Sequence, residues 1–147
     1  MRTASLFILG AIALWAQNSK LGGSPDAKPP VSEGDIRIVQ RAREILDSPA
    51  KWNRADNRRC PATQHTYSLY CALEKATKEV SRKFEHRGAA MQEARFAIDE
   101  VLANGNHYEH RLKDYNNDPK TTFADVQKFF DLVEERIKQR LAAQSRK

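Results

Sequence analysis

Residues 122–141 read TFADVQKFFDLVEERIKQRL, the stretch of the chain that decides its fold class. Apolar side chains recur in it at three- and four-residue spacing, which gathers them on one face of a helix. The residues on this face are Phe123, Val126, Phe130, Val133, Ile137 and Leu141. Thr122 and Asp125 have the spacing of a capping box, so we expect the helix to begin there.

Three earlier stretches carry the same helical periodicity. They cover residues 32–46, 63 or 66 to 84, and 89–103. Ser32 has the side chain of an N-cap, and Asn104-Gly105-Asn106 is typical of a helix end, because glycine readily adopts the left-handed conformation. No segment shows strand-like alternation of comparable strength. The sequence therefore predicts an all-α fold of about four helices, arranged as a compact antiparallel bundle or an orthogonal array.

The N-terminal 16 residues differ in kind from the rest of the chain. Arg2 precedes an uncharged and almost wholly apolar run from Ala4 to Ala16. A helix of this length extends only about 20 Å, which is shorter than a hydrocarbon core of about 30 Å. The pattern is typical of a secretory signal peptide that is cleaved after Ala16. An uncleaved N-terminal anchor or a buried helix is the alternative.

The chain has the composition of one small domain behind a leader. Residues 1–16 form the predicted signal peptide, 17–31 a flexible linker with several Gly and Pro, 32–143 the helical domain and 144–147 a disordered tail. We therefore expect an exported protein, periplasmic or secreted, whose mature chain has no membrane span. The formal net charge is +6, but acidic and basic residues alternate along the helices, which disfavours a nucleic-acid partner.

Cys60 and Cys71 are the only two cysteines in the chain. An even number of cysteines in a protein with an export signal predicts a disulfide. This bond would also hold down the polar segment 50–64, which has little apolar content of its own. Two alternatives use His65 as well: a thiolate nucleophile, which lacks a positioned base, and a metal site, which lacks a fourth ligand. We expect neither a metal nor a cofactor.

The segment from His107 to Asp125 holds the candidate binding residues. They are His107, Tyr108, His110, Asp114, Tyr115, Asn116, Asn117 and Asp118. A structural role accounts for many of them, because Asn and Asp side chains bond their own backbone in turns. Two histidines are only half of a zinc site. A calcium loop that began at Asp114 would need glycine where Pro119 stands.

Three short motifs resemble those of an uncharacterised bacterial domain family of unknown function. They are Cys71-Ala72-Leu73, Asn116-Asn117-Asp118, and Thr122 with Asp125-Val126 and Phe129-Phe130. In that family a Cys-x-Leu helix precedes an aromatic-Asn-Asp turn and a Thr-x-x-(Asp/Glu)-Val helix. The resemblance extends over residues 36–137 and implies the same helical fold, but no activity. The chain departs from the family pattern by its export signal, its second Asn and its extra Cys60.

These residues favour a binding or interaction module of the cell envelope over an enzyme. Its surface would be the polar corner Tyr108–Pro119, with Arg54, Arg58 and Arg59 as further candidates. The partner would be a protein or a polar small molecule.

Two alternatives to a binding module are open. The first is an extracytoplasmic hydrolase that uses His107 or His110 as its base and Asp114 or Asp118 as the partner of that base. The second is a weak nucleic-acid or anionic-surface binder, which requires the arginines to form one continuous stripe. An enzyme would gather its histidines and carboxylates in one pocket, whereas a binding module would use them in caps, turns or an open face.

Overall fold

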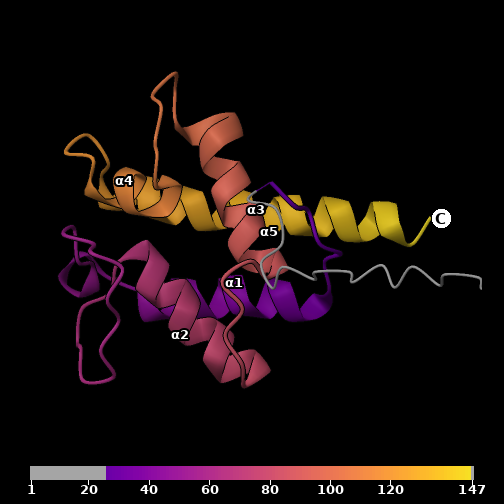
Figure 1. Ribbon diagram of the computed structural model, residues 1–147, viewed down its shortest axis with the longest axis horizontal. Helices are drawn as coiled ribbons and strands as arrows, with labels where there is room; N and C mark the ends of the chain where they lie inside the picture. The colour runs from indigo at the N-terminus through magenta and orange to yellow at the C-terminus, as the bar shows by residue number, and fades with distance from the viewer. Residues whose placement is uncertain (1–25, 147) are drawn as a thin grey trace, which may run out of the picture.

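The computed structural model describes residues 26–146, and this part of the chain contains helices and no β-strand (Figure 1). In chain order the elements are α1 (Glu33–Ile45), η1 (Pro49–Lys51), α2 (Leu69–Ser81), α3 (Ala89–Ala97), η2 (Ile98–Leu102), α4 (Arg111–Asn117) and α5 (Phe123–Gln144). The all-α fold predicted from the sequence is confirmed. None of the helices within 26–146 combines the length and apolarity that crossing a membrane requires. The predicted signal peptide, residues 1–16, and most of the predicted linker lie outside the described residues.

Helices α1 and α5 begin at the two predicted N-caps. At the start of α1, the Asp35 carboxylate accepts from the backbone N–H of Ser32 at 2.8 Å. At the start of α5, Asp125 accepts from the backbone N–H of Thr122 at 2.9 Å. Each capping box satisfies N–H groups that a first helical turn leaves unpaired, and its acid lies at the positive end of the helix dipole. These local contacts decide where α1 and α5 start.

The hydrophobic core lies between α1, α5 and the helices that pack across them. Helices α1 and α5 extend along the long axis of the molecule, while α2 packs against α1 and α3 against α5 (Figure 1). The largest fully buried apolar side chains are Leu46, Leu69, Leu73, Met91, Ile98, Phe129, Phe130 and Ile137. Since burying one such side chain contributes about 1.5–3 kcal/mol, the apolar faces of the helices hold the fold together.

Helix α2 begins at Leu69, several residues after the start that the sequence predicted. The backbone before it is already paired, because Tyr67 donates to the carbonyl of Lys51 at 2.7 Å and Asn53 donates to the carbonyl of Tyr67 at 2.9 Å. These bonds hold the chain extended up to Tyr67. The Ser68 side chain then caps α2 by accepting a backbone N–H of the first turn.

A fifth helix, α4, stands where the sequence predicted only a turn. Asp114 caps its first turn by accepting from the backbone N–H of His110 at 2.7 Å. The side chains of Leu112 and Tyr115, both in α4, are buried. A helix of seven residues is too short to show a periodic pattern. The predicted third helix also differs, because α3 passes into η2, one wider turn of π-helix.

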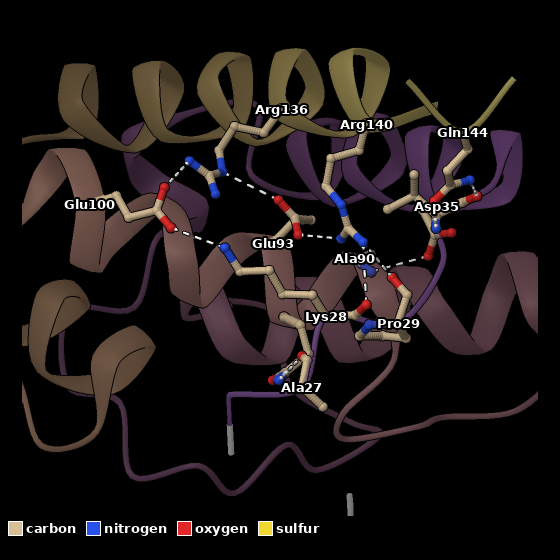
Figure 2. A network of polar contacts seen from close by, with 12 residues as sticks. Ala27, Lys28, Pro29, Asp35, Ala90, Glu93, Glu100, Arg136, Arg140 and Gln144 are labelled. Carbon is tan, nitrogen blue, oxygen red and sulfur yellow. Dashed lines mark hydrogen bonds and ion pairs between the residues drawn. The ribbon is translucent and has the colours of Figure 1, made fainter. Parts of the chain in front are cut away.

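Residues 26–31, which we call the N-terminal strap, are the described part of the predicted linker. The strap lies along α3 and α5 (Figure 2). Its backbone bonds to three side chains of these helices: Val31 to Gln144 (two bonds of 2.9 Å), Pro29 and Lys28 to Arg140 (2.9 and 3.3 Å) and Ala27 to Gln92 (2.8 Å). The strap is therefore held by hydrogen bonds along its length.

A fully buried carboxylate, Glu93 of α3, lies between two arginines of α5 (Figure 2). Its oxygens accept from Arg140 at 2.5 Å and from Arg136 at 3.3 Å. Arg136 also pairs with the more exposed Glu100 at 2.8 Å, and Arg140 continues to the strap. Because a buried charge is tolerated only when it is paired, this cluster joins α3, α5 and the strap.

Candidate functional site

A pocket of about 570 Å³ is formed by four parts of the chain. They are loop 53–67, the first turn of α2, the α2–α3 connection together with α3 and η2, and segment 106–113. The lining residues are Arg58, Tyr70, His86, Arg87, Gln92, Arg95, Asp99, Asn106, His107, Tyr108, Glu109, His110, Arg111, Leu112 and Lys113. A volume of this size is typical of sites that hold a small organic ligand.

Positive charge dominates this pocket. Five basic side chains line it: Arg58, Arg87, Arg95, Arg111 and Lys113. Against them stand two carboxylates, Asp99 and Glu109. Arg111 pairs with Asp99 at 2.6 Å, whereas the other three arginines form no ion pair within residues 26–146. Guanidinium groups gathered in a concave site attract anions, and they bond oxyanions with good geometry.

Arg95 of α3 is half-buried, and within residues 26–146 its guanidinium hydrogen-bonds only neutral acceptors. It donates to the carbonyl oxygen of His86 at 2.8 Å and to Gln92 Oε1 at 2.7 Å, and its Nη2 lies 3.1 Å from His86 Nε2. Burial lowers the pKa of Arg95 to about 10, and the charges of Arg111 and Arg87 act in the same direction. Arg95 is still cationic at neutral pH, so an anion beside it would stabilise the charged form.

The contact with Arg95 also decides where the proton of His86 lies. Because an arginine only donates hydrogen bonds, His86 Nε2 must accept, and the ring proton is then on Nδ1. Nδ1 is 3.2 Å from the hydroxyl oxygen of Tyr70, so His86 donates to that oxygen. The hydroxyl proton of Tyr70 is left available to a ligand. Burial, followed by the charges of Arg95 and Arg87, lowers the pKa of His86, which favours the neutral ring.

The side chain of Arg87, in the connection between α2 and α3, contains a buried donor. Its Nη1 atom is buried and has no hydrogen-bond partner among residues 26–146. Buried donors in proteins are nearly always paired, whether by protein, water or ligand. The Nη1 atom of Arg87 is therefore an uncompensated donor inside the fold, on a residue whose side chain also lines the pocket.

The disulfide and a tight turn bring Arg58 to the pocket. Cys60 and Cys71 are bonded, with Cα atoms 5.4 Å apart, so the predicted disulfide is confirmed. The bond ties loop 53–67 to the first turn of α2. Within the loop, Asp56 accepts from the backbone N–H of Arg58 at 2.7 Å, in a turn where Arg58 has a φ of 60°. Together these constraints fix the backbone from which Arg58 extends.

Three of the eight candidate binding residues line the pocket: His107, Tyr108 and His110. They come from the segment that precedes α4. The binding role of these residues stays a prediction. The other five candidates do not line the pocket, and their contacts lie within the fold.

Asn116 and Asn117 tie α4 to the loop before α2. Asn116 is fully buried, and its side-chain oxygen accepts from the indole N–H of Trp52 at 2.9 Å and from the backbone N–H of Leu69 at 3.0 Å. Asn117 exchanges two side-chain hydrogen bonds with the backbone of Asp56. Both amides thus replace backbone partners that the irregular loop lacks.

The remaining candidates hold the ends of α4 in place. Asp118 accepts from the backbone N–H of Lys120 at 2.8 Å and from the Tyr108 hydroxyl at 2.7 Å, and these two bonds lower its pKa. Asp114 caps the first turn of α4, as described above. Tyr115 is buried, and burial raises its pKa to about 12. The bonds of Asp114 and Asp118 go to backbone groups and a tyrosine hydroxyl.

This geometry can be compared with what a hydrolytic His–Asp pair and a metal site each require. Within residues 26–146, neither Asp114 nor Asp118 hydrogen-bonds the ring of a histidine, which is the contact that a hydrolytic His–Asp pair uses. The same residues contain no group of three or more His, Cys, Asp or Glu side chains arranged to hold a metal ion.

Sequence patterns do not single out most of the residues that give the pocket its charge. The charged residues missed in this way are Arg87, Arg95 and Arg111, and the neutral ones are Tyr70 and His86. They stand in no common motif, and on a helical wheel an arginine beside a pocket looks like any solvated arginine. The one signal in the sequence is the excess of basic residues, a net charge of +6, which says nothing of position.

Comparison with known proteins identifies a family. Residues 30–136 match the family of unknown function DUF6197. No curated protein and no solved structure matches the chain. The matched segment extends from the strap into α5 and includes every residue that lines the pocket. The chain therefore belongs to DUF6197, a family of unknown function, in agreement with the resemblance found in its sequence motifs.

Proposed function

We propose that this protein is an exported binding domain whose cationic pocket holds an anionic small molecule. The observation that carries the proposal is that Arg58, Arg87 and Arg95 line one pocket without an ion pair among residues 26–146. Like charges held together in a partly buried site destabilise each other. An anion between them would remove that repulsion.

The contacts of the histidines favour binding over catalysis. Both ring nitrogens of His86 are engaged, one with Arg95 and the other with Tyr70, so this ring orients its neighbours. A general base instead needs a free nitrogen directed at the reacting group and a second residue that orients the ring. His107 and His110 line the pocket, but neither Asp114 nor Asp118 orients their rings.

Two neutral variants, Arg87→Gln and Arg95→Gln, test the pocket directly. Isothermal titration calorimetry of the wild-type domain with pyrophosphate and with citrate measures the affinity for two unlike anions. We expect at least one of them to bind, and each variant to weaken that binding about 10- to 100-fold, the range for losing a hydrogen bond to a charged group. Arg87→Gln is the cleaner variant, since Arg87 Nη1 bonds nothing within residues 26–146.

The matched control is Arg37→Gln, which removes one exposed positive charge from α1, outside the pocket. Its affinity should stay within about twofold of the wild type, because exposed charges at a distance are screened by salt. Equal weakening by Arg37→Gln and Arg87→Gln would show that net charge, and not this pocket, attracts the anion. Binding of neither anion to the wild type would exclude the proposal.

The exported location is supported by two features of the chain. The apolar run that ends at Ala16 has the length and flanks of a signal peptide, and disulfides such as Cys60–Cys71 persist in oxidising compartments. Mass spectrometry of the protein recovered from its host, with and without reductant, tests both. We expect a chain that begins near Gln17 and gains two hydrogens on reduction. An intact N-terminus with two free thiols would contradict export.

A further inference from the structure

We infer that the group recognised in the pocket is the phosphate of a small phosphate monoester. This inference rests on the proposed anion-binding function and specifies its ligand. It is drawn from the donors that the pocket offers, from the separate segments that carry them and from the volume of the pocket.

The donors of the pocket outnumber its acceptors and come from separate segments. Arg58 extends from loop 53–67, Arg87 from the α2–α3 connection and Arg95 from α3, and the Tyr70 hydroxyl adds a neutral donor. A carboxylate offers two oxygens in one plane, which a single bidentate arginine satisfies. A phosphate offers three oxygens in a tetrahedral arrangement, so it can bond donors that approach from several sides.

The charge of the pocket also fits a phosphate better than a carboxylate. Arg111 is occupied by Asp99 at 2.6 Å and by Asp26 of the strap at 3.0 Å, which leaves the three arginines without ion pairs to meet the ligand. A phosphate monoester carries a charge of about −1.5 to −2 at pH 7, whereas a carboxylate carries one negative charge. The phosphate therefore neutralises more of the positive charge of the three arginines than a carboxylate does.

The pocket is larger than a single inorganic ion needs. Its volume of about 570 Å³ lies within the usual range for organic ligands. Beyond the arginines, the lining continues with His107, Tyr108 and Glu109, which offer an aromatic ring, imidazole nitrogens and a carboxylate acceptor. These groups suit a polar organic part with hydroxyl groups. The ligand class is therefore a phosphorylated polar molecule, and the phosphate is its anchor.

Three compounds built on the same sugar ring separate the possibilities: glucose 6-phosphate, glucuronate and glucose. Titrated into the wild-type domain by calorimetry, glucose 6-phosphate should bind at least tenfold more tightly than glucuronate, and glucose should not bind measurably. Arg87→Gln should weaken glucose 6-phosphate binding at least tenfold, whereas Arg37→Gln should change it less than twofold. Inorganic phosphate should bind at least threefold more weakly than glucose 6-phosphate, since it lacks the organic part.

The outcomes separate the ligand class from the proposed function. Binding of glucuronate or citrate as tight as that of glucose 6-phosphate, and equally sensitive to Arg87→Gln, would overturn the phosphate assignment and keep the anion-binding domain. If inorganic phosphate bound as tightly as glucose 6-phosphate, the inference that the ligand is a phosphate monoester would be overturned. If no anion binds, pyrophosphate and citrate included, both the phosphate assignment and the proposed function fail.

Discussion

Replacement of Glu93 by alanine is expected to lower the free energy of unfolding by about 3–5 kcal/mol, the range for removing one partner of a buried ion pair. Glu93 is fully buried between Arg136 and Arg140, so its loss leaves two guanidinium groups facing each other without their shared carboxylate. Urea unfolding followed by circular dichroism measures the change. The backbone N–H of Val31 should also exchange faster with solvent, because Arg140 holds the strap.

Glu100→Ala is the matched control for this prediction. Glu100 pairs with the same Arg136 at 2.8 Å, but its side chain is 46% exposed. Exposed ion pairs contribute at most about 1 kcal/mol, so this variant should unfold close to the wild type. If Glu93→Ala and Glu100→Ala had equal effects, the buried carboxylate would not be the junction between α3, α5 and the strap.

Removal of the disulfide by the double substitution Cys60→Ala and Cys71→Ala is expected to cost about 3 kcal/mol in unfolding free energy, the chain-entropy figure for a short loop. The bond joins residues 11 positions apart and anchors a loop with few apolar contacts of its own. Urea unfolding of the variant against the oxidised wild type measures this. Because the loop carries Arg58, anion affinity should fall as well.

Reduction of the wild-type disulfide provides an independent comparison, since it breaks the same bond without changing any residue. Its unfolding midpoint should shift in the same direction as that of the double variant. An unchanged midpoint in both would mean that the hydrogen bonds of Asn116 and Asn117 hold the loop in place without the covalent bond.

The features predicted correctly from the sequence are those encoded by neighbouring residues. The apolar stripe of α5 repeats from Phe123 to Leu141, and the Ser32 and Thr122 caps lie within three residues of their acids. The disulfide followed from there being only two cysteines in a chain with a predicted export signal. Each of these signals is either a spacing between neighbouring residues or a number of residues of one type. No knowledge of the tertiary structure is therefore needed to interpret it.

The features that the sequence did not reveal depend on contacts between distant segments. Helix α4 is short, and it is held by Asn116, whose partners lie 47 and 64 residues away. The same Asn-Asn-Asp stretch was a candidate ligand site because polar side chains that replace backbone partners look like a binding cluster. The pocket itself arises where Arg58, Arg87 and Arg95 meet, and nothing local distinguishes these arginines from solvated ones.

The central claim is that the pocket arginines that form no ion pair within residues 26–146 bind an anion. A crystal structure of the domain soaked with pyrophosphate tests it most directly. The claim predicts tetrahedral density within hydrogen-bond distance of Arg87 and Arg95, with the Tyr70 hydroxyl as a further donor. Density that lay only on exposed arginines outside the pocket, such as Arg37, or an empty pocket at a saturating concentration of pyrophosphate, would contradict it.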